Sequence, residues 1–130
     1  MKILQPHDWP RPKGYSNGII ARGQTVYVSG MIGWDEHGRL VGKDFISQAR
    51  QALKNVVAVL NQANARPEDI VRMNWYVADK EEYLASQKQL GDVYREVIGL
   101  HYPAMTAVQI AGLVEAGARL EIEVTAVIPE

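Results

Sequence analysis

The sequence predicts an α+β fold, a two-layer sandwich in which two helices cover one face of a mixed β-sheet. Between residues 119 and 128, apolar side chains alternate with charged or polar ones, as in a strand with one face on a core. Residues 44–64 instead repeat apolar side chains at helical spacing. Because a second helical segment follows a strand-like segment, the expected element order is β-β-α-β-α-β-β.

The N-terminal third is predicted to hold an arm, a hairpin and a loop. Residues 5–13 contain Pro6, Pro10 and Pro12, which indicate an extended arm rather than a regular element. Strands are expected over Ile19–Arg22 and Thr25–Ser29, joined by a hairpin turn at Gly23-Gln24. A polar loop is expected to follow, from Trp34 to Gly42.

The middle of the chain is predicted to alternate helix and strand. Asp44 is a suitable N-cap for a long amphipathic helix that runs to about Asn64. Its apolar stripe consists of Ile46, Ala49, Leu53, Val56, Val57, Leu60 and Ala63. Residues 70–78 are β-branched and aromatic enough for a strand. Asp79 followed by Glu82 resembles a capping box, so a second helix is expected from there to Gly99.

Two strands are predicted to complete the sheet, over residues 104–110 and 119–128. In the second, Glu121 and Glu123 share the face opposite the core. The other side chains expected on the uncovered face are Tyr27, Thr106, Val108 and Val127. Because this mixture is partly apolar, we infer that the uncovered face meets other subunits.

The composition fits one globular domain, which we expect to span residues 1–130. Hydrophobic residues make up 47% and charged residues 22% of the 130 residues. A formal net charge of −1 gives no sign of the basic surface that binds nucleic acid, so nucleic acid is not an expected partner. The chain has no cysteine, no apolar stretch for a signal peptide and none for a membrane span. A cytoplasmic protein without membrane association is therefore expected.

Motifs for metals and nucleotides are absent. His7, His37 and His101 stand apart, with neither HxH nor HExxH spacing, so no metal site is expected. The glycine-rich segments GYSNG and SGMIG match neither the phosphate-binding loop nor the dinucleotide-binding motif.

Five segments carry a resemblance that spans nearly the whole chain. They are GYSNGI at 14–19, VYVSGMIG at 26–33, QARQALKNVVAVL at 48–60, VYREVIGLHYPAMTAV at 93–108 and LEIEVTAV at 120–127. In this order and spacing, the chain resembles the RidA (YjgF/YER057c/UK-type) family of reactive-intermediate deaminases. The resemblance implies a chorismate-mutase-like fold and a homotrimer with a central barrel, with the sites in clefts between subunits. It also implies hydrolysis of enamines or imines to the keto form and ammonia without a metal or organic cofactor.

Several residues match the family's site position by position. Tyr15 matches the tyrosine of the first turn, and Ser29 and Gly30 match the Ser-Gly that ends the second strand. Glu121 matches the glutamate that is thought to position the attacking water. The resemblance therefore implies Glu121 and Tyr15 as catalytic residues, and Ser29 and Gly30 as substrate-binding residues.

Two further positions of the implied substrate site depart from the family's pattern. Met105 stands where active deaminases carry the arginine of a PAR motif, and Gly91 falls where many members place an asparagine. A guanidinium binds a carboxylate through two hydrogen bonds, whereas a thioether offers no donor. The chain therefore looks like an arginine-lacking branch of the family, and we expect 2-aminoacrylate not to be its substrate.

Two hypotheses of function remain open. In the first, the protein hydrolyses a small reactive enamine or imine, with Glu121 as base and with Tyr15 and Ser29 as hydrogen-bond donors. In the second, a trimer binds a small metabolite or a protein partner in the same cleft without chemistry. Glu123 is expected to be structural, although the glutamate pair could instead hold Arg119 or an arginine of a neighbouring subunit.

Overall fold

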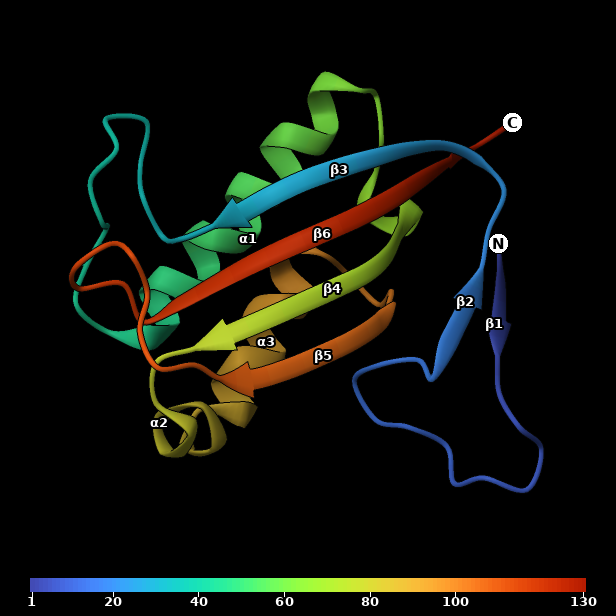
Figure 1. Cartoon of the computed structure of the whole chain (residues 1–130), viewed down its shortest axis with the longest axis horizontal. Coiled ribbons are helices and arrows are strands. Elements are labelled where there is room, and N and C mark those ends of the chain that lie inside the picture. Colours follow the sequence, from blue (N-terminus) through green and yellow to red (C-terminus); the bar gives the residue numbers. More distant parts are fainter.

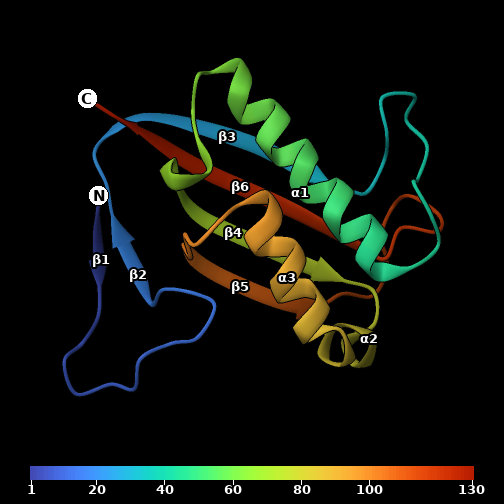
Figure 2. The same ribbon diagram turned by 180° about the vertical axis from the view of Figure 1, so that it is seen from behind.

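A mixed four-stranded sheet forms the centre of the computed structural model, which describes all 130 residues. Its strands follow the order β3 (Gly23–Met31), β6 (Leu120–Pro129), β4 (Ile70–Val77) and β5 (Ala104–Gln109). β4 and β5 are parallel, and the other neighbouring strands are antiparallel. The helices are α1 (Phe45–Gln62), α2 (Lys80–Ala85) and α3 (Gln87–Val97), and a short 3-10 turn, η1 (Pro67–Asp69), precedes β4. α1 and α3 cover one face of the sheet (Figures 1 and 2), which confirms the α+β class.

The hydrophobic core lies between the sheet and the helices α1 and α3. From the predicted helical stripe, Ala49, Leu53, Val56 and Leu60 are fully buried. From β6, the alternating residues Leu120, Ile122, Val124 and Ala126 are buried as well. Asp44 caps α1 as predicted, because its carboxylate accepts a hydrogen bond of 2.9 Å from the Ser47 amide. Two periodic patterns in the sequence therefore define the two walls of the core.

The predicted hairpin over residues 19–29 is wrong. β2 (Gly18–Ile20) pairs instead with β1 (Lys2–Leu4), an N-terminal strand that was not predicted. The two form a separate ribbon beside the main sheet (Figure 1). β3 begins at Gly23 itself, which has a φ of 149°. A Cβ there would lie 1.9 Å from the carbonyl oxygen of Ile128, so this glycine permits close strand pairing rather than a hairpin turn.

The second predicted helix is divided into α2 and α3, so the structure has three helices where two were expected. Asp79 caps α2 by accepting hydrogen bonds from the amides of Glu81 and Glu82. The Ser86 hydroxyl then donates to the Glu82 carbonyl at 2.8 Å, and the helix breaks at this serine. Such a bond to the residue four positions earlier competes with the helical hydrogen-bond pattern and bends helices.

The other face of the sheet is uncovered (Figure 1). Glu121 and Glu123 lie on it as predicted, opposite Tyr76 and Asn74 of the neighbouring strand β4. Tyr27, also on this face, is 80% exposed. A broad face with an exposed aromatic side chain is typical of a surface that meets another molecule. The homotrimer with a central barrel stays a prediction.

No helix of the chain is long and apolar enough to span a membrane.

Candidate active site

Four of the candidate site residues lie in two groups that the sheet separates, Gly30 and Glu121 in one and Gly91 and Met105 in the other. Met105 is paired with the buried Met73, so its side chain lies on the helix-covered face. Glu121 is paired with Tyr76 and lies on the uncovered face. Because neighbouring positions across strands point to the same face, Met105 and Glu121 of one subunit do not meet.

The first group surrounds a cleft of about 200 Å³, which we call the acidic cleft. Its lining consists of Gly30, Ile32, Trp34, Leu113, Val114, Glu115 and Glu121. A Cβ at Gly30 would lie 2.3 Å from Oε1 of Glu121, so only glycine allows the carboxylate to lie against this strand. The register between β3 and β6 shifts between Val28 and Met31, next to this contact. Such irregularities often occur beside active sites, where they redirect a side chain.

Glu121 and Glu123 have different surroundings. Glu123 accepts hydrogen bonds from the Tyr76 hydroxyl and the Asn74 amide. These bonds, that from Tyr76 first, hold the pKa of the Glu123 carboxyl below its ordinary value. Glu121, two residues earlier, accepts no hydrogen bond from another side chain or backbone group of the subunit. Glu123 is thus a structural residue as predicted, while the Glu121 carboxylate is free to bind a water or a ligand.

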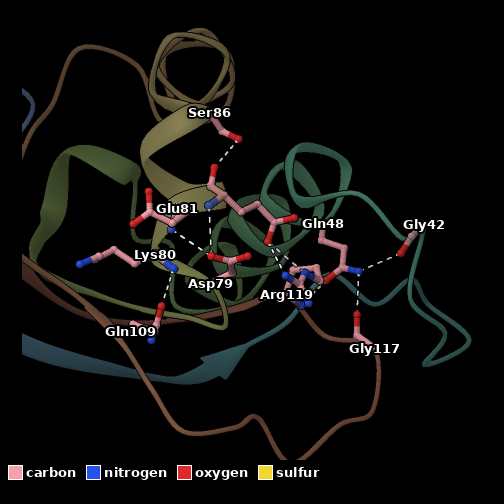
Figure 3. Close-up of polar contacts among 10 residues, drawn as sticks. Gly42, Gln48, Asp79, Lys80, Glu81, Ser86, Gln109, Gly117 and Arg119 are labelled. Atoms are coloured by element: carbon pink, nitrogen blue, oxygen red, sulfur yellow. Dashed lines mark hydrogen bonds and ion pairs between the residues drawn. The ribbon is translucent and has the colours of Figure 1, made fainter.

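Gln48 of helix α1 binds two backbone segments that lie far apart in the sequence (Figure 3). Its fully buried side-chain amide donates to the carbonyls of Gly42 at 2.8 Å and Gly117 at 3.0 Å. Its carbonyl oxygen accepts from the amide of Arg119 at 2.7 Å. Because residues 117–119 end the loop that carries Leu113 and Val114, this buried glutamine anchors that loop to α1.

Asn55, two turns further along α1, fixes the opposite wall of the acidic cleft. Its amide donates to the carbonyls of Ile32 at 3.0 Å and Trp34 at 2.9 Å. Gly33 lies between them, and a Cβ there would come within 2.6 Å of the Cα of Gln48. Sequence reasoning missed both Gln48 and Asn55. A polar residue beside the apolar stripe of a buried helix was the available signal, since buried polar groups are usually hydrogen-bonded.

Arg119 pairs with α2 rather than with the glutamates of its own strand. Its Nε and Nη2 donate to Oε2 of Glu82 at 3.0 and 2.7 Å. Figure 3 shows Arg119 near Asp79, which caps α2. The alternative in which Glu121 and Glu123 hold Arg119 is therefore wrong. The ion pair instead links α2 to the start of β6.

The second group lies around a hollow of about 320 Å³, which we call the basic hollow. It brings together Gly91 of α3 and Met105 of β5, the two positions that depart from the family pattern. Its lining consists of Lys13, Gly14, Trp75, Tyr83, Gln87, Leu90, Gly91, Tyr94, Arg95, Tyr102 and Met105. This lining includes two cationic side chains and no carboxylate. The hollow is therefore suited to an anion with an apolar part.

Two tyrosines give the basic hollow a rigid aromatic side. The rings of Tyr94 and Tyr102 are stacked with centroids 5.3 Å apart. The Tyr94 hydroxyl donates to the carbonyl of His101 at 2.6 Å, and burial raises the pKa of Tyr94. The ring Nε2 of His101 lies 2.6 Å from the carbonyl oxygen of Ile70, which gives this histidine a structural contact.

Tyr15 lies in a neighbouring hollow of about 330 Å³ that shares Tyr102 with the basic hollow. The adjacent Ser16 positions it, since the amide of Ser16 donates to the carbonyl of Pro103 at 2.9 Å. Tyr15 is 43% exposed. Ser29 is exposed on β3, one residue before Gly30, and lines neither the acidic cleft nor the basic hollow. No three His, Cys, Asp or Glu side chains gather to hold a metal ion.

The chain and its fold belong to a known class of proteins. The family model described as Endoribonuclease L-PSP matches residues 9–128, so the chain belongs to that family. A Homo sapiens relative named 2-iminobutanoate/2-iminopropanoate deaminase is 32% identical over 114 residues, which cover 87% of this chain and 79% of the relative. These findings confirm the predicted RidA family, whereas the arginine-lacking branch stays a prediction.

Solved structures of the same family share the fold. A Yersinia pestis protein of unknown function, YyfB of the conserved Rid protein family, is similar with a TM-score of 0.83. It is 29% identical, with 98% of each chain covered. RidA from an Antarctic Psychrobacter species is 32% identical with a TM-score of 0.70, over 98% of this chain and 100% of that one.

Proposed function

We propose that residues 1–130 form a single domain that hydrolyses a small reactive enamine or imine without a cofactor. The observation that carries this proposal is the Glu121 carboxylate, which lies in the acidic cleft with no partner in its own subunit. The names of deaminase relatives support the class of reaction. A carboxylate beside mainly apolar side chains is suited to take a proton from water.

The reaction adds one water and releases ammonia. Glu121 takes a proton from water while the oxygen bonds to the C=N carbon, and the electron pair of the C=N bond moves to nitrogen. Glu121 gives this proton to the nitrogen, which completes an amino alcohol. Glu121 then takes the hydroxyl proton as the C=O bond forms and passes it to the nitrogen as the C–N bond breaks. The keto product and ammonia leave, and the carboxylate is restored. Tyr15 and the Ser29-Gly30 segment are suited to donate hydrogen bonds to the reacting atoms.

The complete site, in this proposal, forms between subunits of a homotrimer. The basic hollow of one subunit, with Met105 and Tyr15 at its side, would face the acidic cleft of the next. The separation of the two groups within one subunit supports this arrangement, as does the exposed face around Tyr27. Light scattering at micromolar concentration should give three times the 14.5 kDa chain mass. A mass of 14.5 kDa, that of a monomer, would contradict the proposal of a site shared between subunits.

The substrate, we propose, is not 2-aminoacrylate or the short imine formed from it. In such a molecule the carboxylate is attached to the reacting carbon. The arginine that would bind this carboxylate in the family is Met105 here, and a thioether has no donor. An isolated carboxylate next to Met105 would lose its hydration without a hydrogen bond in return.

Glu121→Gln tests the role of the carboxylate. The change keeps the shape of the side chain and removes the base, so turnover of an accepted imine should fall by about 100-fold or more while ligand binding is kept. Glu123→Gln is the matched control, because it makes the same change on the same strand and face. It should leave turnover nearly unchanged.

Unchanged turnover in Glu121→Gln would remove this residue from the mechanism. Ligand binding without turnover in the wild type, across a panel of imines, would instead identify a metabolite-binding trimer without catalytic activity. A thermal-shift screen finds the ligands first, because saturation at 100 times the Kd stabilises a protein by about 2.7 kcal/mol.

A further inference from the structure

Arg95 stands directly beside Gly91 in the basic hollow. The two residues are one helical turn apart on α3, on the same side of the helix. A Cβ at Gly91 would lie 3.4 Å from Nη1 and 3.7 Å from Nη2 of Arg95. Because glycine has no side chain, the guanidinium is open to the hollow at this point.

The guanidinium keeps free donors. Asp92 accepts from its Nη2 at 2.6 Å, which leaves Nη1 and Nε without a partner in the subunit. This pair lies at the surface, with the Arg95 side chain 48% exposed, and such pairs contribute little to stability. An incoming anion therefore does not have to break a strong interaction. Lys13 supplies a second cation to the same hollow.

The two departures from the family pattern can then be explained together. An asparagine at position 91 would extend its side chain over the Arg95 guanidinium, whereas Gly91 leaves it open. With Met105 in place of the family's arginine, strand β5 carries no guanidinium and presents an apolar side chain to the hollow. The positive charge of the hollow thus comes from helix α3 instead of strand β5.

We propose that Arg95, with help from Lys13, binds the carboxylate of a small monocarboxylate ligand whose apolar chain packs on Met105 and Tyr102. This inference rests on the proposed function in taking that ligand as the deaminase substrate. Since the cation is on α3 and not at position 105, the carboxylate lies away from the reacting carbon. The substrate class is then an imine or enamine in which an apolar chain separates the C=N group from the carboxylate.

Binding of hexanoate and of its neutral amide, hexanamide, tests the inference by isothermal titration calorimetry. The wild type should bind hexanoate at least tenfold more tightly than hexanamide. Arg95→Gln should weaken hexanoate binding by about tenfold and leave hexanamide unchanged, as expected for one charge-assisted hydrogen bond. Gly91→Asn should weaken hexanoate binding as well, without any change of charge.

Arg50→Gln is the matched control. Arg50 is also a helical arginine in a surface ion pair, with Glu96, and its side chain is 39% exposed. It lies outside the basic hollow, so its replacement removes the same charge and should leave hexanoate binding unchanged. Thermal unfolding of each variant shows whether it is folded under the conditions of the titration.

Three results would overturn the inference: equal binding of hexanoate and hexanamide, equal binding by Arg95→Gln and wild type, or no binding of hexanoate. Because the titration requires no turnover, its outcome is independent of the proposed chemistry. Loss of hexanoate binding in Arg95→Gln, together with full turnover by Glu121→Gln, would support the carboxylate site and reject the proposed base.

Discussion

The acidic cleft and the basic hollow differ in how their charged groups are held. Glu121 stands on the inner strand β6, and the side chains of Gln48 and Asn55 on α1 fix both walls around it. Arg95 and Lys13 stand on a helix surface and in the N-terminal segment, where long side chains are free to adjust. Chemistry needs a group held in a fixed geometry, whereas charge recognition tolerates movement. This difference supports our proposal that the acidic cleft carries out the reaction and the basic hollow recognises the charge of the ligand.

The largest effect on stability is expected at Gln48, which supports the acidic cleft and does not line the basic hollow. Gln48→Leu leaves the carbonyls of Gly42 and Gly117 and the amide of Arg119 without their partner. A buried unsatisfied group costs about 1–3 kcal/mol, and Gly117 is exposed while Gly42 and Arg119 are half-buried, so the free energy of unfolding should fall by about 2 kcal/mol. Urea unfolding at fixed protein concentration measures this loss.

Gln62→Leu is the control for that change, since Gln62 is exposed at the end of the same helix. It should change stability by less than about 0.5 kcal/mol. A loss below about 1 kcal/mol in Gln48→Leu would show that the cleft wall does not depend on this residue.

Met105→Arg tests the role of the basic hollow. The change returns a guanidinium to β5, where it is suited to bind a carboxylate attached to the reacting carbon. Turnover of 2-iminopropanoate, generated in the assay, should rise at least tenfold. Met105→Leu keeps the size and the apolar character and should show no gain. If the wild type already matches an arginine-bearing relative with this substrate, the explanation of Met105 is wrong.

The smallest effect is expected for Tyr76→Phe, which removes the hydrogen bond that Tyr76, the neighbour of Glu121 on β4, donates to Glu123. In the folded protein that bond lowers the pKa of Glu123, so it stabilises the fold above the ordinary glutamate pKa. The benefit is lost as pH falls through the lowered pKa. The Tm of the variant should be about 2 °C below that of the wild type at pH 7.

That difference in Tm should shrink as pH falls below the ordinary glutamate pKa of about 4.3 and through the lowered pKa of Glu123. Tyr27→Phe is the control, because the Tyr27 side chain is exposed and its hydroxyl has no partner in the subunit. A difference in Tm that stays constant down to pH 3 would mean that the charge of Glu123 is not involved.

Much of the fold was predictable because its signals are local. The alternation in β6 and the apolar stripe of α1 predicted both walls of the core, and Asp44 predicted the start of α1. The hairpin at residues 19–29 was not predictable in the same way. Gly23 is typical of a turn, and only its approach to the Ile128 carbonyl shows that it serves strand pairing.

The candidate site also has features that local sequence signals predict and features that depend on contacts between distant segments. The residue types can be read from the sequence, including the glutamate at 121, the methionine at 105 and the glycine at 91, and so can the family. The three-dimensional structure was needed to show that Met105 and Glu121 lie on opposite faces of the sheet and that Arg95 is open to the hollow beside Gly91. Strand order and register depend on hydrogen bonds between distant segments, and no local pattern in the chain encodes them.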